Sequence, residues 1–176
     1  MVERFEDGSI FVEVGTHLGK SISYLAVEII NSNKNISLYC VDKWDRRLEN
    51  KLTEQPELLS KNSNCDRYER FLKNIKPIEN FIKPIKSSST EAANNFADNS
   101  LDFVFIDAGH DYDSVKADLD AWYPKLKPAG VFAGHDYDYP RWRGVVKAVD
   151  DFCVNKKLTL MSPQREHCWV IDLKQS

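Results

Sequence analysis

Two hydrophobic patterns alternate along the chain. Short, mainly apolar runs of the strand type occur at residues 10–14, 37–41, 81–85, 101–106 and 130–133. Between several of these runs, apolar residues recur at helical spacing, at residues 21–31, 113–126 and 144–153. Strands that alternate with helices in this way predict an α/β fold, with a parallel sheet covered by helices on both faces.

Length and composition limit the classes of protein to consider. A chain of 176 residues, 42% of them hydrophobic, is of the size of one compact domain, so we expect a single domain over residues 1–176. A net charge of -3 argues against a general nucleic-acid-binding surface. The N-terminus has no apolar signal core, and no apolar run could span a bilayer. Widely separated cysteines indicate free thiols, at Cys40, Cys65, Cys153 and Cys168. We therefore expect a cytoplasmic protein that binds neither nucleic acid nor membrane.

The segment FVEVGTHLGKS, residues 11–21, has the pattern of a buried strand, a glycine turn and a helix start. Gly15 and Gly19 let the backbone approach a ligand, and the amides that open the helix favour polar ligand groups. His17 occupies the place of the middle glycine in a dinucleotide motif and would crowd a pyrophosphate, which weakens an NAD interpretation. The alternative to a cofactor loop is a turn that only allows tight packing.

An acidic strand residue followed by Gly-x-x-x-Gly resembles motif I of the class I S-adenosylmethionine-dependent methyltransferases. The resemblance implies that the methionine part of the cofactor is received by this turn, at Glu13, Gly15, Thr16, Gly19 and Ser21.

Polar residues after the second and third strands are further candidates for cofactor binding. Asp42 lies where a carboxylate can accept hydrogen bonds from both hydroxyls of a ribose, although an exposed Asp that ends a strand is the alternative. Trp44 either lies along the adenosine or packs in the interior. The hydroxyls of residues 87–90 favour helix capping, and the resemblance implies that Ser88 or Ser89 lies beside the adenine. The polar segment 45–66 is either a lid over the cofactor or a solvated insertion.

Two similar sequences end adjacent predicted strands, FIDAGHDY at 105–112 and GVFAGHDY at 130–137. They place Asp107 and Asp136 in one crevice, with His110 and His135 beside them. Carboxylates that lie close together repel each other unless a cation or proton lies between them, so the pattern indicates a divalent metal site. In the alternative, one Asp caps a helix and the other binds a loop amide.

These motifs, with the Leu126-Lys127-Pro128 turn, resemble the small-molecule O-methyltransferases related to macrolide-sugar methyltransferases. The resemblance implies a doubly wound Rossmann-like domain with a mostly parallel seven-stranded sheet, closed by an antiparallel hairpin at 158–161 and 168–173. It also implies that Asp107 and Asp136 hold Mg²⁺ and that His110 is the general base. A neutral imidazole can take a hydroxyl proton near neutral pH.

The chain departs from that family in two places. His135 stands where the metal-dependent relatives carry Glu or Asp, so a site of Asp107, His135 and Asp136 should bind Mg²⁺ less well and favour Mn²⁺ or Fe²⁺ more than theirs does. Few residues precede the first strand, so the acceptor pocket is either open or completed by a second subunit, as in a homodimer. The loop 138–143 has two arginines that flank Trp142, and it is either an ordinary surface loop or a grip for an anionic or sugar acceptor.

The sequence therefore predicts S-adenosylmethionine-dependent methyl transfer to a hydroxyl of a small molecule, for instance a sugar, with assistance from Mg²⁺ or Mn²⁺. Two alternatives stay open. One is an NAD-linked oxidoreductase, and the other is a cofactor-binding scaffold subunit without turnover.

Overall fold

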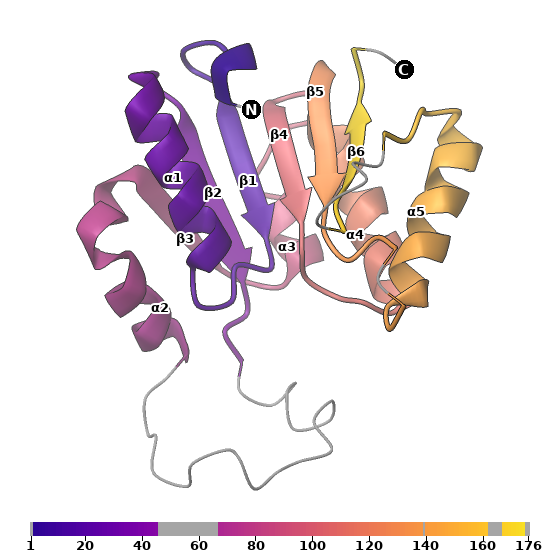
Figure 1. The fold of residues 1–176 in the computed structure, drawn as a ribbon, viewed down its shortest axis with the longest axis horizontal. Coiled ribbons are helices and arrows are strands. Elements are labelled where there is room, and N and C mark those ends of the chain that lie inside the picture. Colours follow the sequence, from indigo (N-terminus) through magenta and orange to yellow (C-terminus); the bar gives the residue numbers. More distant parts are fainter. Residues whose placement is uncertain (1, 46–66, 139, 162–166, 175–176) are drawn as a thin grey trace, which may run out of the picture.

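A single six-stranded sheet organises the protein (Figure 1). The computed structural model describes residues 2–45, 67–138, 140–161 and 167–174. The strands follow the order β3-β2-β1-β4-β5-β6, and β6 alone runs antiparallel to its neighbour. Their bounds are β1 Ile10–Val14, β2 Ser37–Asp42, β3 Ile82–Lys86, β4 Leu101–Ile106, β5 Leu126–Gly134 and β6 Trp169–Asp172. The predicted α/β fold with an antiparallel C-terminal strand is confirmed.

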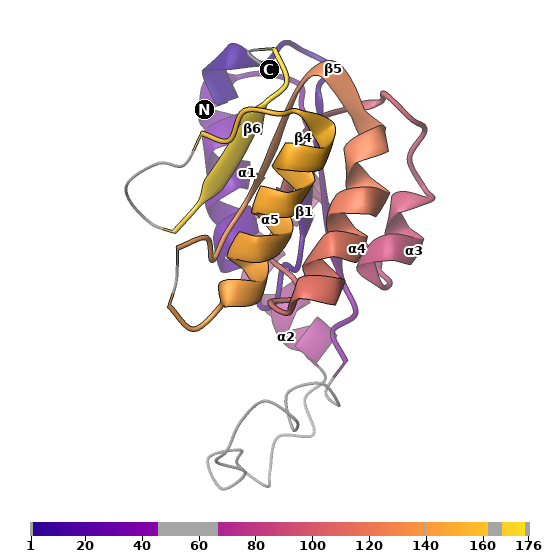
Figure 2. The same cartoon turned by 90° about the vertical axis from the view of Figure 1, so that its right-hand side faces the viewer.

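Helices cover both faces of the sheet (Figure 2). On one face, α1 and α2 pack on Phe11, Leu38 and Cys40. On the other face, α3, α4 and α5 enclose a second apolar cluster that includes Trp122 and Phe132. The helix bounds are α1 Lys20–Ser32, α2 Arg67–Ile75, α3 Ser89–Ala93, α4 Tyr112–Trp122 and α5 Arg143–Lys156. Strands buried on both faces explain the nearly continuous apolar runs in the sequence.

Short 3₁₀ helices complete the described elements, at η1 Val2–Arg4, η4 Lys76–Phe81 and η5 Tyr123–Lys125. The last of these changes one predicted boundary. The spacing predicts a helix over 113–126, but α4 ends at Trp122 and the chain continues as η5. Pro124 is the reason, because proline cannot donate the amide hydrogen bond that would extend an α-helix.

The predicted seven-stranded count and C-terminal hairpin need correction. The described residues form a six-stranded sheet, and β6 has no full partner strand within 158–161. Met161 alone bridges to Val170, through a reciprocal pair of backbone hydrogen bonds of 2.7 and 3.0 Å. Leu158 instead donates its amide to Cys153 at the end of α5, so this segment continues the helix cap rather than the sheet.

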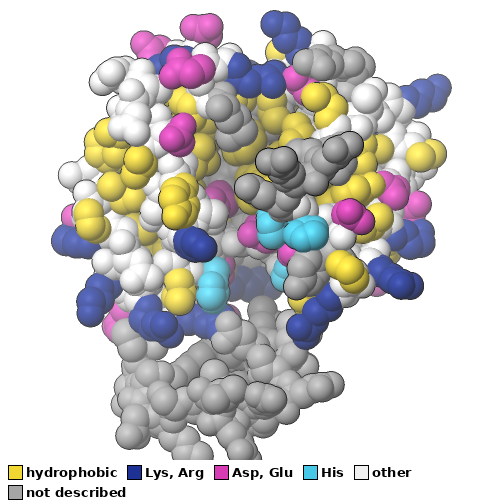
Figure 3. All heavy atoms as spheres, in the orientation of Figure 1, with side chains coloured by type: hydrophobic (Ala, Val, Ile, Leu, Met, Phe, Trp, Pro, Cys, Tyr) yellow, Lys and Arg dark blue, Asp and Glu magenta, His cyan; other side chains and the backbone are white. Residues whose placement is uncertain are grey.

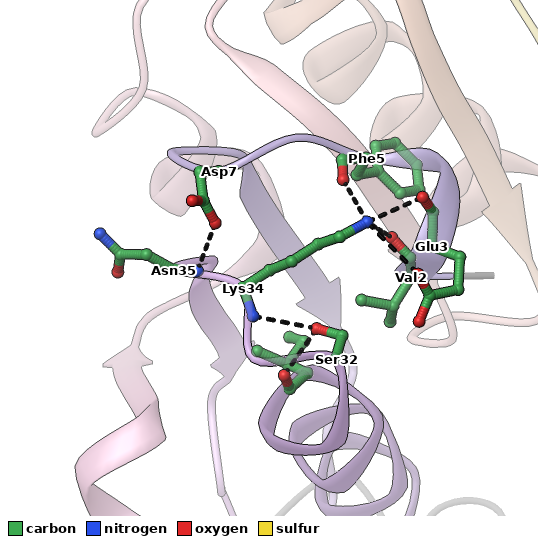
Figure 4. Close-up of polar contacts among 8 residues, drawn as sticks. Val2, Glu3, Phe5, Asp7, Ser32, Lys34 and Asn35 are labelled. Carbon is green, nitrogen blue, oxygen red and sulfur yellow. Dashed lines mark hydrogen bonds and ion pairs between the residues drawn. The ribbon is translucent and has the colours of Figure 1, made fainter.

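Lys34 fastens the N-terminal segment to the end of α1 (Figure 4). Its Nζ donates hydrogen bonds to the carbonyl oxygens of Glu3 at 2.7 Å and Phe5 at 2.8 Å. Phe5 in turn packs on Phe11 and Phe103 of the sheet. The residues before β1 therefore form part of the packed structure.

Three loops meet where the strand order reverses, between β1 and β4. The amide of Asp107 donates to the carbonyl of Val14 at 2.7 Å, and the amide of His135 donates to that of Ile106 at 3.0 Å. Open α/β sheets bind ligands in the crevice outside the carboxyl ends of the strands, at this kind of switch point. The predicted site residues therefore come together at one edge of the sheet.

Two further expectations concern the chain as a whole. The described helices include none that is long and apolar enough to cross a membrane. Cys40, Cys153 and Cys168 are free thiols, whereas Cys65 lies outside the described residues. So does the predicted lid at 45–66, apart from Asp45.

Candidate functional site

The glycine turn leaves β1 and enters α1 by a path that side chains would block. Gly15 has a φ of 93°, and a Cβ there would overlap the carbonyl group of Asp107. Gly19 has a φ of 89°, and a Cβ there would lie 2.9 Å from Ile75 Cγ2. Gly19 is also the N-cap of α1, and no side chain caps the first amides of this helix. These amides are available to a polar ligand group.

Glu13 lies beneath this turn and is only 2% exposed. The Ser21 hydroxyl donates a hydrogen bond of 2.8 Å to its Oε1. Burial raises the pKa of the Glu13 carboxyl to about 8, and the nearby carboxylates of Asp107 and Asp42 act in the same direction. Thr16 is also buried, and its Oγ1 has no hydrogen-bond partner among the described residues. The predicted methionine-binding residues thus lie together at the turn, with Glu13 and Thr16 buried and Ser21 bonded to Glu13.

Asp42 joins the glycine turn to the end of β2. Its carboxylate accepts hydrogen bonds from the amides of His17 at 2.8 Å and Trp44 at 2.7 Å. Each oxygen retains a second lone pair, so the geometry is compatible with ribose hydroxyls as additional donors. Trp44 is 3% exposed and packs against Tyr68 and Phe71, which favours its packing interpretation over an adenosine contact.

The serines after β3 have structural partners. Ser88 is the N-cap of α3, and its hydroxyl oxygen accepts the amide of Glu91. Ser89 Oγ accepts a hydrogen bond of 2.9 Å from the indole of Trp122 and so ties α3 to α4. The predicted capping is therefore present, and the contact of these serines with adenine stays a prediction.

An acidic and imidazole cluster occupies the ends of β4 and β5. Asp107, His110 and Asp136 each offer a ligand atom within 4.8 Å of the others. His110 Nε2 lies 2.7 Å from Asp136 Oδ2, and His135 Nδ1 lies 3.1 Å from the other oxygen of the same carboxylate. Histidine and acidic side chains line the hollow on this face (Figure 3). The sequence-based expectation that the two strand ends share one crevice is confirmed.

Electrostatics in this cluster favour a bound cation or proton. Burial raises the pKa of the Asp107 carboxyl above its usual value, His135 opposes the rise, and Asp136 adds to it. The alternative, in which Asp107 or Asp136 caps a helix, does not hold for α4. The N-cap of that helix is Asp111, whose side chain accepts the Ser114 amide at 2.9 Å. Two carboxylates beside imidazoles form a donor set that fits a divalent cation such as Mn²⁺.

His110 also has an aromatic neighbour that sequence reasoning did not assign to it. Its ring stacks on Trp142, with centroids 4.3 Å apart and planes at 20°. Arg141 Cζ lies 4.9 Å from the centroid of the same indole. The only signal in the sequence was the position of this loop directly after Asp136.

Comparison with known proteins agrees with this geometry. Residues 12–137 match the family model described as Methyltransferase domain, family 24. This match covers most of the chain, so the protein belongs to that family of S-adenosylmethionine-dependent methyltransferases.

Individual relatives are more distant. The chain is 28% identical over 125 residues to the uncharacterized protein y4gI of Sinorhizobium fredii, and it spans only 13% of the length of that protein. The O-methyltransferase NovP is similar in structure, with a TM-score of 0.68 and 14% identity over 94% of this chain and 72% of NovP. CalS11, a TDP-rhamnose 3'-O-methyltransferase, has a TM-score of 0.63 and 16% identity over 93% of this chain and 71% of its own. These structures establish the Rossmann-like methyltransferase fold.

Proposed function

We propose that the protein transfers a methyl group from S-adenosylmethionine to a hydroxyl of a small molecule, with His110 as the general base. The observation that carries this proposal is the cluster of Asp107, His110 and Asp136 beside the glycine turn. NovP and CalS11 are O-methyltransferases, which supports a hydroxyl acceptor, and CalS11 acts on TDP-rhamnose, which supports a sugar.

The cofactor half of the site is formed by β1, β2 and α1. The first amides of α1 and the glycine turn would bind the methionine part, and Asp42 would accept hydrogen bonds from the ribose hydroxyls. When bound, S-adenosylmethionine supplies an electrophilic methyl group on a positively charged sulfur. Glu13, which accepts a hydrogen bond from the Ser21 hydroxyl, keeps the turn in position.

His110 performs the proton transfer in this proposal. Its side chain is 30% exposed, so an acceptor hydroxyl can reach the imidazole. Trp142 covers one face of the ring and Asp136 contacts Nε2, so the base is held in a fixed orientation. Removal of the hydroxyl proton makes the oxygen a stronger nucleophile for the methyl group.

Asp107 and Asp136 would hold a divalent cation, with His135 beside Asp136. Such a cation supplies Lewis acidity that lowers the pKa of the acceptor hydroxyl. Because His135 replaces a hard oxygen ligand, we expect Mn²⁺ to support the reaction better than Mg²⁺.

The test is methyl transfer from labelled S-adenosylmethionine to a panel of sugars, sugar phosphates and phenols, with Mn²⁺ or Mg²⁺ present. We expect His110→Gln to lower kcat by about 100-fold or more, the usual contribution of a general base. His167→Gln is the matched control, because His167 is an exposed histidine outside the cluster. Unchanged turnover in His110→Gln would refute the base assignment. Cofactor binding without transfer to any acceptor would favour a scaffold subunit.

A further inference from the structure

We propose that Arg141 and Arg143 form a subsite for an anionic group on the acceptor, so that the substrate is a hydroxylated molecule that carries a phosphate or a carboxylate. This inference rests on the proposed function and specifies its substrate class. It depends on the position of the two arginines next to the base and on the charges around them.

Arg141 lies close to the base through Trp142. Trp142 lies between the two arginines in sequence, and its indole contacts both the His110 ring, at 4.3 Å, and the Arg141 guanidinium, at 4.9 Å. The Arg141 guanidinium and the His110 imidazole are therefore no farther apart than the sum of these two distances. A sugar ring can span this gap, with a hydroxyl at His110 and an anionic substituent at Arg141.

The backbone after the arginine loop packs against the base loop. Arg143 and Gly144 open α5, and a Cβ on Gly144 would lie 2.7 Å from both the His110 carbonyl oxygen and the Tyr112 amide. Only glycine allows this approach of the two backbones. The backbone that carries the arginines is therefore packed against the backbone of the base loop, which keeps the two arginines on the same side of the site as His110.

The positive charges of the two arginines are not neutralised by ion pairs among the described residues. Arg141 and Arg143 are exposed, and neither has an ion-pair partner among the residues that the structure describes. Three carboxylates of this region have other partners, and Asp138 of the same loop has no ion pair with either arginine among the described residues. Asp136 lies between two histidines, while α5 carries Asp150, bonded by the Tyr137 hydroxyl, and Asp151, paired with Lys147.

Two guanidinium groups that have no carboxylate partner among the described residues, on the loop that carries the neighbour of the base, are suited to an anionic ligand. A guanidinium binds phosphate or carboxylate through two parallel hydrogen bonds, which gives both affinity and orientation. The indole between them is half-buried and supplies an apolar wall. A neutral acceptor would form no ion pair with either arginine.

The experiment measures binding of three matched probes: glucose 1-phosphate, glucuronate and glucose. The reporter is the indole N–H signal of Trp142 in ¹H–¹⁵N NMR spectra, assigned with Trp142→Phe, and the other tryptophan signals serve as references. We expect saturable shifts with one or both anions and none with glucose. A response to the phosphate alone would identify a phosphorylated acceptor, and a response to glucuronate alone a uronate-like one.

Variants then locate the anion. Arg141→Gln and Arg143→Gln should each weaken anion binding by about tenfold, the loss expected for one charge-assisted contact. Lys157→Gln removes one charge at the opposite end of α5 and should leave binding unchanged. Equal shifts with glucose, no shift with either anion, or equal losses in all three variants would overturn the subsite.

The titrations are made with and without S-adenosylhomocysteine, whose binding is measured separately by calorimetry. If S-adenosylhomocysteine binds and the anions do not, the subsite is wrong and the proposed function stands. If the anions bind at the arginines and S-adenosylhomocysteine does not, the cofactor assignment is wrong and the anion site stands.

Discussion

Glu13→Gln should make the stability of the protein less dependent on pH. The Glu13 carboxyl is 2% exposed, and burial raises its pKa from 4.5 to about 8. A raised carboxyl pKa means that the folded state binds a proton that the unfolded state has released. The stabilisation is therefore complete below pH 4.5 and is lost as the pH rises through 8.

The size of the effect follows from the shift. At about 1.4 kcal/mol for each pKa unit, the free energy of unfolding of the wild type should fall by on the order of 5 kcal/mol relative to Glu13→Gln across this interval. Urea unfolding at several pH values, followed by tryptophan fluorescence, measures both curves. Ser21→Ala should steepen the wild-type dependence, because the hydrogen bond from Ser21 lowers the pKa of Glu13. Parallel curves for wild type and Glu13→Gln would refute the reasoning.

Three other variants test separate parts of the structure. Gly15→Ala should abolish S-adenosylhomocysteine binding in calorimetry and cost about 1–3 kcal/mol in urea unfolding, because its Cβ would overlap Asp107 at a positive φ; retained binding would contradict the turn geometry. Lys34→Met should cost about 2 kcal/mol in the same assay, since two short hydrogen bonds from an ammonium are lost. Lys83→Met, which loses one exposed bond, is its control and should cost less. Mn²⁺ should raise the thermal midpoint of the wild type but not of Asp136→Asn; an equal rise in both would place the ion elsewhere.

The central strands β1 and β4 were predictable because they are buried on both faces, so their sequences are nearly all apolar. The edge strand β3 is partly exposed and has a shorter apolar pattern. The glycine turn was predictable because its requirements are local: Gly15 and Gly19 both adopt positive φ. The convergence of Asp107 and Asp136 followed from one topological rule, that adjacent parallel strands end at the same edge. Nothing in these inferences required knowledge of side-chain packing.

Long-range partners could not be predicted in this way. The aromatic contact of Trp142 with His110 depends on the close approach of α5 to the base loop at Gly144. Ser89 bonds to Trp122, which lies on another helix. The predicted C-terminal hairpin is wrong in its first strand, because an apolar run such as 158–161 has the same pattern whether it pairs with a strand or ends a helix.

The most direct test of the cofactor site is calorimetric titration of the purified protein with S-adenosylhomocysteine, with NAD⁺ as the control ligand and Asp42→Ala as the variant. We predict saturable binding of S-adenosylhomocysteine, at least about tenfold weaker binding in Asp42→Ala because the charge-assisted ribose contacts are lost, and no binding of NAD⁺. Preference for NAD⁺, or binding that Asp42→Ala leaves unchanged, would contradict a methyltransferase site at the Gly15 turn.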